Sequence, residues 1–229
     1  MLLNVDLDHH TTFGSRSEVE SFFEDWLRGV PHVVRAEQLQ PVDIDLAVPG
    51  EHNRRNAAAA LAALELAGVQ RADCEYAIAA FTGAGRRLEP KGEAGGVSVL
   101  DSYAHHPAEL AADLAAVRVG GSVLALFQPH LYSRTLHLAH GFAEALAAAD
   151  AACVSEIYAA REAPVPGVSG RLIVEELAAL RPGMRIGWAP ELEDAAALVA
   201  GWARPGDTVL TLGAGDVDRA APLILEALK

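Results

Sequence analysis

From Val97 to the end of the chain, short apolar runs alternate with longer stretches in which apolar residues recur every three or four positions. Short apolar runs are typical of buried strands, whereas the wider spacing is typical of amphipathic helices. Strands are expected at residues 97–103, 122–127, 152–157, 184–188 and 208–212. Helices are expected at residues 107–118, 133–149, 171–180, 192–203 and 217–228. This alternation predicts an α/β domain whose mostly parallel sheet has helices on both faces.

The first 80 residues show a different pattern. Residues 1–7 are apolar enough to predict a short strand, and residues 17–28 predict a helix capped by Ser17. Apolar and acidic residues alternate at 42–48, which predicts a strand with one side facing solvent. The alanine-rich segment 53–67 predicts a helix that Gly68 closes.

A domain boundary is expected where the texture of the sequence changes. Gly83 and Gly85 interrupt the pattern, and Gly95-Gly96 is expected to form the turn of a hairpin. We therefore place the boundary near Ala80, which gives two domains, residues 1–80 and 81–229.

Composition narrows the classes of protein to consider. The net charge of −13 argues against a general nucleic-acid surface, although a few arginines suffice to bind phosphates. No apolar run approaches the roughly 20 residues that a membrane span needs, and the N-terminus lacks a secretory pattern, so a cytoplasmic protein is expected. The two cysteines, Cys74 and Cys153, have no partner spacing and are expected to be reduced thiols. Nothing in the composition predicts an oligomeric state.

Polar residues follow the predicted strands at the point where each strand ends. The carboxyl ends of parallel strands meet at one edge of a sheet, where ligands bind. We therefore expect one site at this edge, with these candidates: Asp101, Tyr103, His105, His106, Gln128, His130, Arg134, Glu156, Tyr158, Arg161 and the segment 213–216.

His130 and Arg134 are the candidates with the clearest chemistry. An imidazole and a guanidinium at the start of a helix can together hold a carboxylate. His105 and His106 precede Pro107, so they could instead form the capped first turn of a helix. Their combination with the stretch 127–134 favours a binding site over capping alone.

Other polar segments have two interpretations each. Asp8, His9 and His10 could bind a metal ion or form an exposed loop. Asn53 and Asn56 share a helix face and could bind a purine, but Asn53 could also be a helix cap.

Two further segments could contact phosphate. The segment 213–216, Gly-Ala-Gly-Asp, could hold a phosphate, although a tight turn is the favoured interpretation. Arg86 and Arg87 could contact phosphate or form a solvated pair.

Seven stretches of the sequence together resemble the Mur ligases. They are residues 4–9, 48–58, 81–89, 101–109, 127–135, 161–170 and 212–216. The paired histidines and the stretch Gln-Pro-His at 128–130 are most similar to the branch that adds L-alanine. The segment 127–135 also argues against a ligase that recycles cell-wall peptides, which shares Asp-x-x-x-His-His-Pro.

This resemblance implies a reaction and an architecture. L-alanine would be joined to the lactyl carboxylate of UDP-N-acetylmuramate through an acyl phosphate, with ATP and Mg²⁺ as cofactors, in peptidoglycan precursor synthesis. Such chemistry depends on positioning and on neutralising negative charge. Residues 1–80 would be part of the central ATP-binding domain, and residues 81–229 would be the Rossmann-like C-terminal domain.

The resemblance also implies roles for individual residues. Magnesium would be bound by His9. Adenine would be bound by His52, Asn53 and Asn56. The γ-phosphate would lie near Arg87, with Arg86 as the weaker candidate, and the ribose near Asp101. The amino acid and the muramyl carboxylate would lie among Tyr103, His105, His130 and Arg134, of which His105, His130 and Arg134 are expected to be catalytic.

Two features depart from the family pattern. Leu131 stands where many relatives have a basic residue, and the ATP-binding pattern Gly-x-x-x-x-Gly-Lys is absent from the 229 residues. We therefore expect a C-terminal portion of a ligase that has no ligase activity alone and binds ATP weakly if at all. The alternative is a non-catalytic binding or regulatory module derived from such a ligase.

Overall fold

The computed structural model describes residues 1–8, 12–118 and 120–229. The chain divides into two compact units, Met1–Gly83 and Ala84–Lys229. His9, the expected magnesium ligand, lies outside the described residues.

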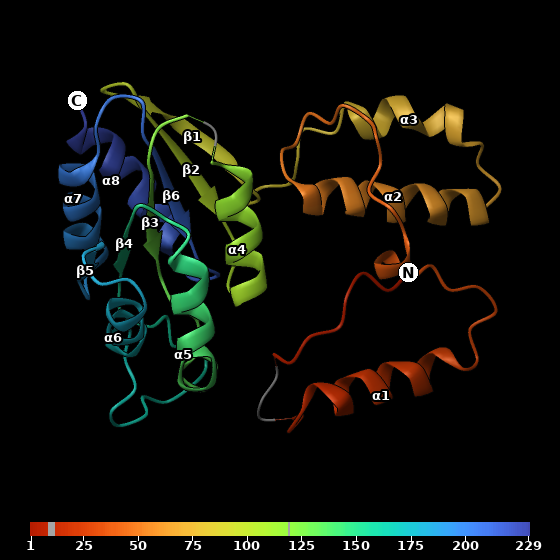
Figure 1. The fold of residues 1–229 in the computed structure, drawn as a ribbon, viewed down its shortest axis with the longest axis horizontal. Coiled ribbons are helices and arrows are strands. Elements are labelled where there is room, and N and C mark those ends of the chain that lie inside the picture. The colour runs from red at the N-terminus through yellow and green to blue at the C-terminus, as the bar shows by residue number, and fades with distance from the viewer. Residues whose placement is uncertain (9–11, 119) are drawn as a thin grey trace. The chain divides into compact units, whose positions relative to one another are not determined.

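The second unit is an α/β domain built on one six-stranded sheet, as the sequence predicted (Figure 1). Its strands are β1 (Glu89–Ala94), β2 (Val97–Ser102), β3 (Val123–Phe127), β4 (Ala151–Val154), β5 (Arg185–Trp188) and β6 (Thr208–Leu212). Its helices are α4 (Pro107–Ala116), α5 (Tyr132–Leu146), α6 (Arg171–Leu180), α7 (Leu192–Trp202), the 3-10 turn η2 (Val217–Arg219) and α8 (Ala220–Ala227). The strand order is β1-β2-β6-β3-β4-β5, and only β1 is antiparallel to its neighbour.

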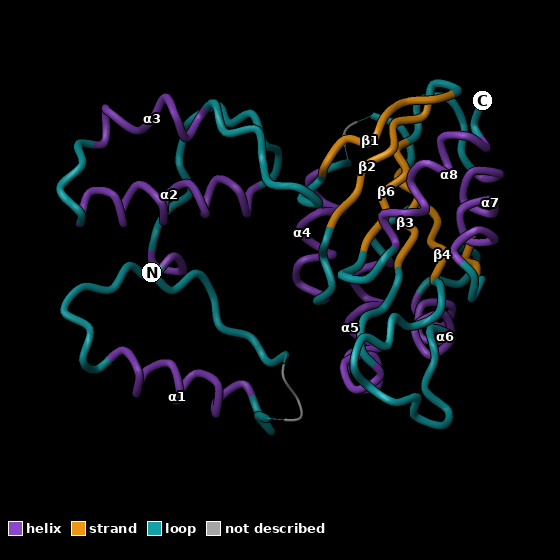
Figure 2. The backbone as a smooth tube through the Cα atoms, turned by 180° about the vertical axis from the view of Figure 1, so that it is seen from behind, coloured by secondary structure: helices purple, strands orange, loops and turns teal. Residues whose placement is uncertain are grey.

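Helices cover both faces of this sheet, and the central strand β3 shows why (Figure 2). All five of its residues are buried, because alternate side chains point into two different cores. Val123, Ala125 and Phe127 pack with residues of α4, α5 and α6. Leu124 and Leu126 pack on the other face with residues of α7 and α8. The continuous apolar run in the sequence is therefore the pattern of a strand covered on both sides.

The expected hairpin is confirmed by the antiparallel pair β1 and β2. Gly95 and Gly96 form its turn with φ angles of 57° and 75°, which glycine adopts without strain. A Cβ atom on Gly95 would also lie 2.7 Å from the carbonyl oxygen of Leu228, so the turn packs closely against the C-terminus.

The first unit contains helices and no strand among the residues that the structure describes. Its elements are α1 (Arg16–Leu27), the 3-10 turn η1 (Ala36–Gln38), α2 (Glu51–Leu66) and α3 (Arg71–Ala79). The cap of α1 is Ser15 rather than Ser17, because the Ser15 hydroxyl accepts a hydrogen bond from the Glu18 backbone. Gly68 follows α2 with a φ of 87°, in agreement with its expected role in ending that helix.

The prediction of two strands in the first unit is wrong. Residues 1–7 form only a single bridge, between Leu2 and Arg35. In the segment 42–48, Val42 is buried and its neighbours alternate as predicted, but the backbone bonds to helices instead of to a strand. Val42 donates to the Arg54 carbonyl and Ala47 donates to the Ala79 carbonyl. Alternation predicted the buried side correctly, but a strand also needs a partner strand.

None of the helices in the described part of the chain is both long enough and apolar enough to cross a membrane.

Candidate functional site

Side chains from three strand ends meet at the carboxyl edge of the sheet in the second unit. The Tyr103 and His105 rings lie 5.4 Å apart, and His105 and His130 lie 6.2 Å apart, between centroids. His130 stacks on Tyr158 at 5.8 Å with an interplanar angle of 13°. Arg134 completes the group, with its Nη1 atom 3.1 Å from Nδ1 of His130. We call these five residues the rim.

The rim is open to solvent at its tyrosines and closed at its arginine. Tyr103 and Tyr158 are each 39% exposed, and His105 and His130 are partly exposed, whereas Arg134 is only 6% exposed. Burial lowers the pKa of His130 below its ordinary value, and the positive charge of Arg134 lowers it further. His130 is therefore expected to be neutral near pH 7.

His106 has the structural role that the capping interpretation predicted. It is the N-cap of α4, and its side chain accepts from the backbone N–H of Ala108. The Glu109 carboxylate accepts from the backbone N–H groups of His105 and His106, at 2.9 and 3.2 Å. The capping box thereby fixes the segment that carries His105 at the rim.

The start of α5 is occupied by a carboxylate of the chain itself. Glu162 accepts from the backbone N–H of Ser133 at 2.9 Å and from its hydroxyl at 2.5 Å. Burial raises the pKa of Glu162, but the hydrogen bonds from Ser133 and Tyr132 outweigh burial and lower this pKa below its ordinary value. The Ser133 amide at this helix start is therefore already bound by Glu162, whereas the expected carboxylate-binding groups, His130 and Arg134, are different side chains on either side of Ser133.

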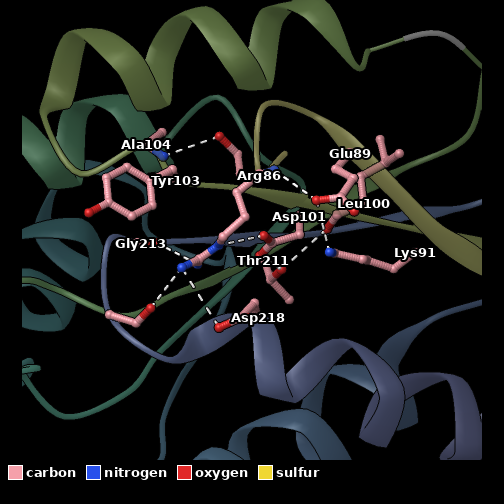
Figure 3. Close-up of polar contacts among 12 residues, drawn as sticks. Arg86, Glu89, Lys91, Leu100, Asp101, Tyr103, Ala104, Thr211, Gly213 and Asp218 are labelled. Carbon is pink, nitrogen blue, oxygen red and sulfur yellow. Dashed lines mark hydrogen bonds and ion pairs between the residues drawn. The ribbon is translucent and has the colours of Figure 1, made fainter. Parts of the chain in front are cut away.

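Arg86 forms the most extensive polar network at this edge (Figure 3). Its Nε donates to the Asp101 carboxylate at 2.8 Å, and its two terminal nitrogens donate to the carbonyls of Gly213 and Gly215, each at 2.8 Å. Its guanidinium also lies 5.2 Å from the centre of the Tyr103 ring. Every part of the guanidinium therefore has a partner within the domain. We call Arg86, Asp101, Thr211, Gly213 and Gly215 the Arg86 network.

Asp101, expected near a ribose, is fully buried in this network. Its second carboxylate oxygen accepts from the Thr211 hydroxyl at 2.6 Å. A buried carboxylate needs such partners, and here they come from strand β6 and from the loop before β1. Asp101 orients Arg86, and Arg86 in turn binds the carbonyls of the loop after β6.

Arg87 contrasts with its neighbour Arg86. Its side chain is 53% exposed, and its Nη1 atom lies 3.5 Å from a carboxylate oxygen of Glu109. Arg86 and Leu88 on either side both have φ above 50°, a conformation that is rare for residues other than glycine. This turn directs Arg86 into the domain and leaves Arg87 accessible to an anion.

The segment 213–216 packs as a tight turn. A Cβ atom on Gly213 would lie 2.6 Å from the Gln128 carbonyl oxygen, and one on Gly215 would lie 2.5 Å from Cγ of Tyr158. Glycine is needed at both positions because protein atoms, rather than an open phosphate cradle, lie against them. The structure favours the turn interpretation.

Of the expected adenine-binding residues, His52 and Asn53 lie in the first turn of α2, in the first unit, and Asn56 lies in the next turn. Gly50, with a φ of 102°, is the N-cap of this helix, so Asn53 is not the cap. The Asn53 side-chain amide donates to the Pro49 carbonyl at 2.6 Å. His52 is partly exposed and Asn56 is exposed. A pocket of about 340 Å³ lies beside the first turn of α2 and is lined by residues 43–46, 48–50 and 54.

A larger hollow of about 850 Å³ lies at the opposite, amino ends of β3, β4 and β5. Arginines lie in and near this hollow, but two of them bind backbone carbonyls at the end of a helix. Arg181 donates to the Ala147 carbonyl and Arg118 donates to the Ala148 carbonyl, both at the end of α5. Cations are favoured at helix C-termini, so these two arginines have a structural role. The hollow lies at the opposite edge of the sheet from the rim and is therefore a separate feature.

No group of three His, Cys, Asp or Glu side chains suited to a metal ion occurs in the part of the chain that the structure describes. The expected magnesium ligand, His9, is outside that part. Both cysteines are free and buried, and burial raises the pKa of the Cys153 thiol to about 12.

Three residues of the site were not assigned a role from the sequence. Tyr158 was recognised as a strand-end residue, but its stacking on His130 depends on a bridge between the two backbones. Glu162 reaches Ser133 across a separation of 29 residues, and no local pattern indicates this contact. Glu109, three residues after His106, does follow capping-box spacing and could have been found.

Comparison with known proteins agrees with this fold. The family described as "Mur ligase, glutamate ligase domain" matches residues 86–215, which contain all six strands of the sheet and the whole rim. The match covers more than half of the chain. The chain belongs to the Mur ligase family.

Similar curated proteins are L-alanine-adding ligases. A UDP-N-acetylmuramate–L-alanine ligase of Streptomyces coelicolor is 41% identical over 281 aligned residues, covering 100% of this chain and 60% of the relative. A ligase of the same name from Saccharopolyspora erythraea is 50% identical over 188 residues, covering 80% of this chain and 38% of the relative. The chain thus spans less than two thirds of these relatives. The alignment of 281 positions exceeds its 229 residues, so the Streptomyces protein also has residues inside the aligned region that this chain lacks.

Solved structures show the same relationship. The UDP-N-acetylmuramate–alanine ligase of Thermotoga maritima superposes with a TM-score of 0.65 at 26% identity, covering 80% of this chain and 39% of that one. A murein peptide ligase of Psychrobacter arcticus, with a TM-score of 0.60 at 23% identity over 81% of this chain and 38% of that one, shows the shared fold alone.

Proposed function

We propose that the chain is the C-terminal portion of a cytoplasmic ligase that joins L-alanine to UDP-N-acetylmuramate with the hydrolysis of ATP. The observation that carries the proposal is the meeting of His105, His130 and Arg134 at one edge of a domain whose similar relatives are L-alanine-adding ligases. The activity belongs to the complete protein, because the chain corresponds to 60% of its Streptomyces relative.

The rim has the chemistry to hold an amino acid and an activated carboxylate. Arg134 supplies a permanent positive charge, and Tyr103, His105 and His130 supply polar atoms around it. In the proposed reaction the muramyl carboxylate takes the γ-phosphoryl group of ATP, and the alanine amine then displaces phosphate. Charge neutralisation and alignment of the two reactants are the main contributions that such a site can make.

The nucleotide would contact residues outside the rim. Arg87 is the better candidate for the γ-phosphate, because Arg86 already has internal partners for its guanidinium. His52, Asn53 and Asn56 are proposed for adenine, and His9 is proposed for Mg²⁺. A related Thermotoga maritima ligase of the same fold was solved with ADP.

The first test uses the chain alone. With ATP, Mg²⁺, UDP-N-acetylmuramate and L-alanine, the 229-residue chain should release no ADP above background. The Gly-x-x-x-x-Gly-Lys loop that binds phosphates is absent from it. Sustained ADP release that requires both substrates would overturn the assignment of the chain as an incomplete catalytic unit.

The second test supplies the missing parts. Residues 84–229 form a compact unit and can replace the matching region of the Streptomyces coelicolor ligase. The chimera should release ADP only when UDP-N-acetylmuramate and L-alanine are both present. A folded chimera that is inactive with L-alanine, or that accepts peptides in its place, would contradict the proposed function.

A further inference from the structure

The hydrogen-bond partners of His105 determine which of its ring nitrogens carries a proton. Its Nδ1 atom lies 2.9 Å from the Tyr103 carbonyl oxygen and 3.5 Å from a carboxylate oxygen of Glu109. Both partners can only accept, so Nδ1 must donate. In the neutral ring the lone pair is then on Nε2, which makes this atom a proton acceptor.

The partner of His130 imposes the opposite arrangement. Its Nδ1 atom lies 3.1 Å from Nη1 of Arg134, and a guanidinium can only donate. Nδ1 of His130 must therefore accept, and the proton of the neutral ring is on Nε2. His130 presents an N–H donor from the nitrogen on which His105 presents a lone pair.

The charges around the two rings support the same division. The Glu109 carboxylate lies 3.5 Å from Nδ1 of His105 and favours the tautomer in which this nitrogen carries the proton. Around His130, Arg134 and Arg161 oppose protonation, His105 opposes it when charged, and Glu162 favours it. The net effect, together with burial, keeps His130 neutral.

We propose that His105 is the proton acceptor and His130 the hydrogen-bond donor of the ligation step, with Tyr158 as a positioning residue for His130. This inference rests on the proposed function. The ring centroids are 6.2 Å apart, so both side chains can contact one bound substrate. Tyr158 holds the plane of His130 by stacking at 13° and by the bridge between their backbones.

The ligation step removes two protons from the alanine nitrogen and exchanges one bond at the acyl carbon. Nε2 of His105 takes one proton from the alanine ammonium, and the resulting amine forms a C–N bond with the acyl carbon. His130 donates from Nε2 to the oxygen that becomes negative in the tetrahedral intermediate. The bond between the acyl carbon and the phosphate oxygen then breaks. The leaving phosphate takes the second nitrogen proton, and the imidazolium of His105 releases its proton to solvent.

The decisive experiment measures the two tautomers in the 229-residue chain by ¹⁵N-edited NMR of the imidazoles. Signals are assigned with His105→Gln and His130→Gln. The proposal expects Nδ1–H for His105 and Nε2–H for His130 near pH 7.5, about one unit above the ordinary histidine pKa. The same tautomer in both rings, or the reversed pair, would overturn it. Because no ligase activity is needed, this result is independent of the proposed function.

Variants test what holds His130. Arg134→Met removes the donor to Nδ1, so the Nδ1–H form of His130 should rise by about fivefold, the equivalent of one hydrogen bond. Tyr158→Ala should broaden or shift the His130 signals, whereas Tyr158→Phe keeps the stacked ring and should restore them. Unchanged His130 signals in a folded Tyr158→Ala chain would remove Tyr158 from the proposal.

Activity of the chimera provides the second readout. His105→Gln removes the base and should lower kcat/KM for L-alanine by about 100-fold or more, with loss of the acidic limb of the pH profile. His130→Gln keeps an N–H donor and should preserve that limb. If the limb survives in His105→Gln, His105 is not the proton acceptor even where the ligase function stands.

Discussion

Arg86 and Asp101 form a buried ion pair, with 2.8 Å between Nε of the arginine and Oδ2 of the aspartate. The aspartate is fully buried, and the same guanidinium holds the carbonyls of Gly213 and Gly215. This pair joins the segment that follows the first unit to the loop after β6. It also distinguishes Arg86, which has a structural role, from Arg87, whereas both arginines had the same two interpretations from the sequence alone.

Arg86→Met should therefore destabilise the chain, whereas Arg87→Met should not. Loss of Arg86 leaves a buried carboxylate with only the Thr211 hydroxyl, so the free energy of unfolding should fall by about 2–3 kcal/mol. Arg87 is 53% exposed, and its replacement should change stability by about 0.5 kcal/mol or less. Urea unfolding of both variants measures the difference. Equal losses would contradict the assignment of Arg86 to the interior.

Gly215→Ala should lower stability because its methyl group meets the side chains of Gln128 and Tyr158. We expect a loss of about 1–3 kcal/mol, typical of overpacking in a dense site. The matched control is Gly201→Ala in α7, where nothing lies within 4 Å of the added methyl group. This control should gain about 0.5–1 kcal/mol from helix propensity and lower chain entropy. A neutral Gly215→Ala would show that the loop yields easily.

Two histidines should shape the dependence of stability on pH in opposite directions. The pKa of His130 is lowered in the folded chain, so between its folded and unfolded values the unfolded state binds more protons. The contribution of His130 to the free energy of unfolding is present above about pH 6.5 and is lost as the pH falls. The pKa of His140 is raised by its hydrogen bond to Glu176, at 2.9 Å, and by Glu144. Its contribution is present below about pH 6.5 and is lost as the pH rises.

Chemical unfolding at about pH 5, 6.5 and 8 checks both signs. His130→Gln should reduce the loss of stability on the acidic side, and His140→Gln should reduce the loss on the alkaline side. An acidic-side effect from His140→Gln, or an alkaline-side effect from His130→Gln, would contradict the environments described for these rings.

The second unit was predictable because its pattern depends on burial alone. The run Val123–Phe127 is apolar throughout since both faces of the sheet are covered, and strands of this kind imply a parallel α/β sheet. Parallel strands then place their carboxyl ends at one edge, which is why Tyr103, His105, His130 and Arg134 could be expected to meet.

The first unit was less predictable because a strand requires a partner that local sequence does not reveal. Val42 is buried as the alternation indicated, yet its amide donates to the Arg54 carbonyl in helix α2 and not to a neighbouring strand. The Arg86 network and the Glu162–Ser133 contact were missed for a related reason. Each joins residues far apart in the chain, and only the fold brings them together.

The most direct measurement of the central claim is the KM for each substrate in the chimera that carries residues 84–229. Arg134→Met should raise the KM for L-alanine or UDP-N-acetylmuramate by about 10- to 100-fold, the loss of one hydrogen bond to a charged group. Arg118→Met, two residues beyond the C-terminal end of α4, is the matched control and should leave both values unchanged. Unchanged KM and kcat in a folded Arg134→Met chimera would contradict the claim that the rim binds the substrates.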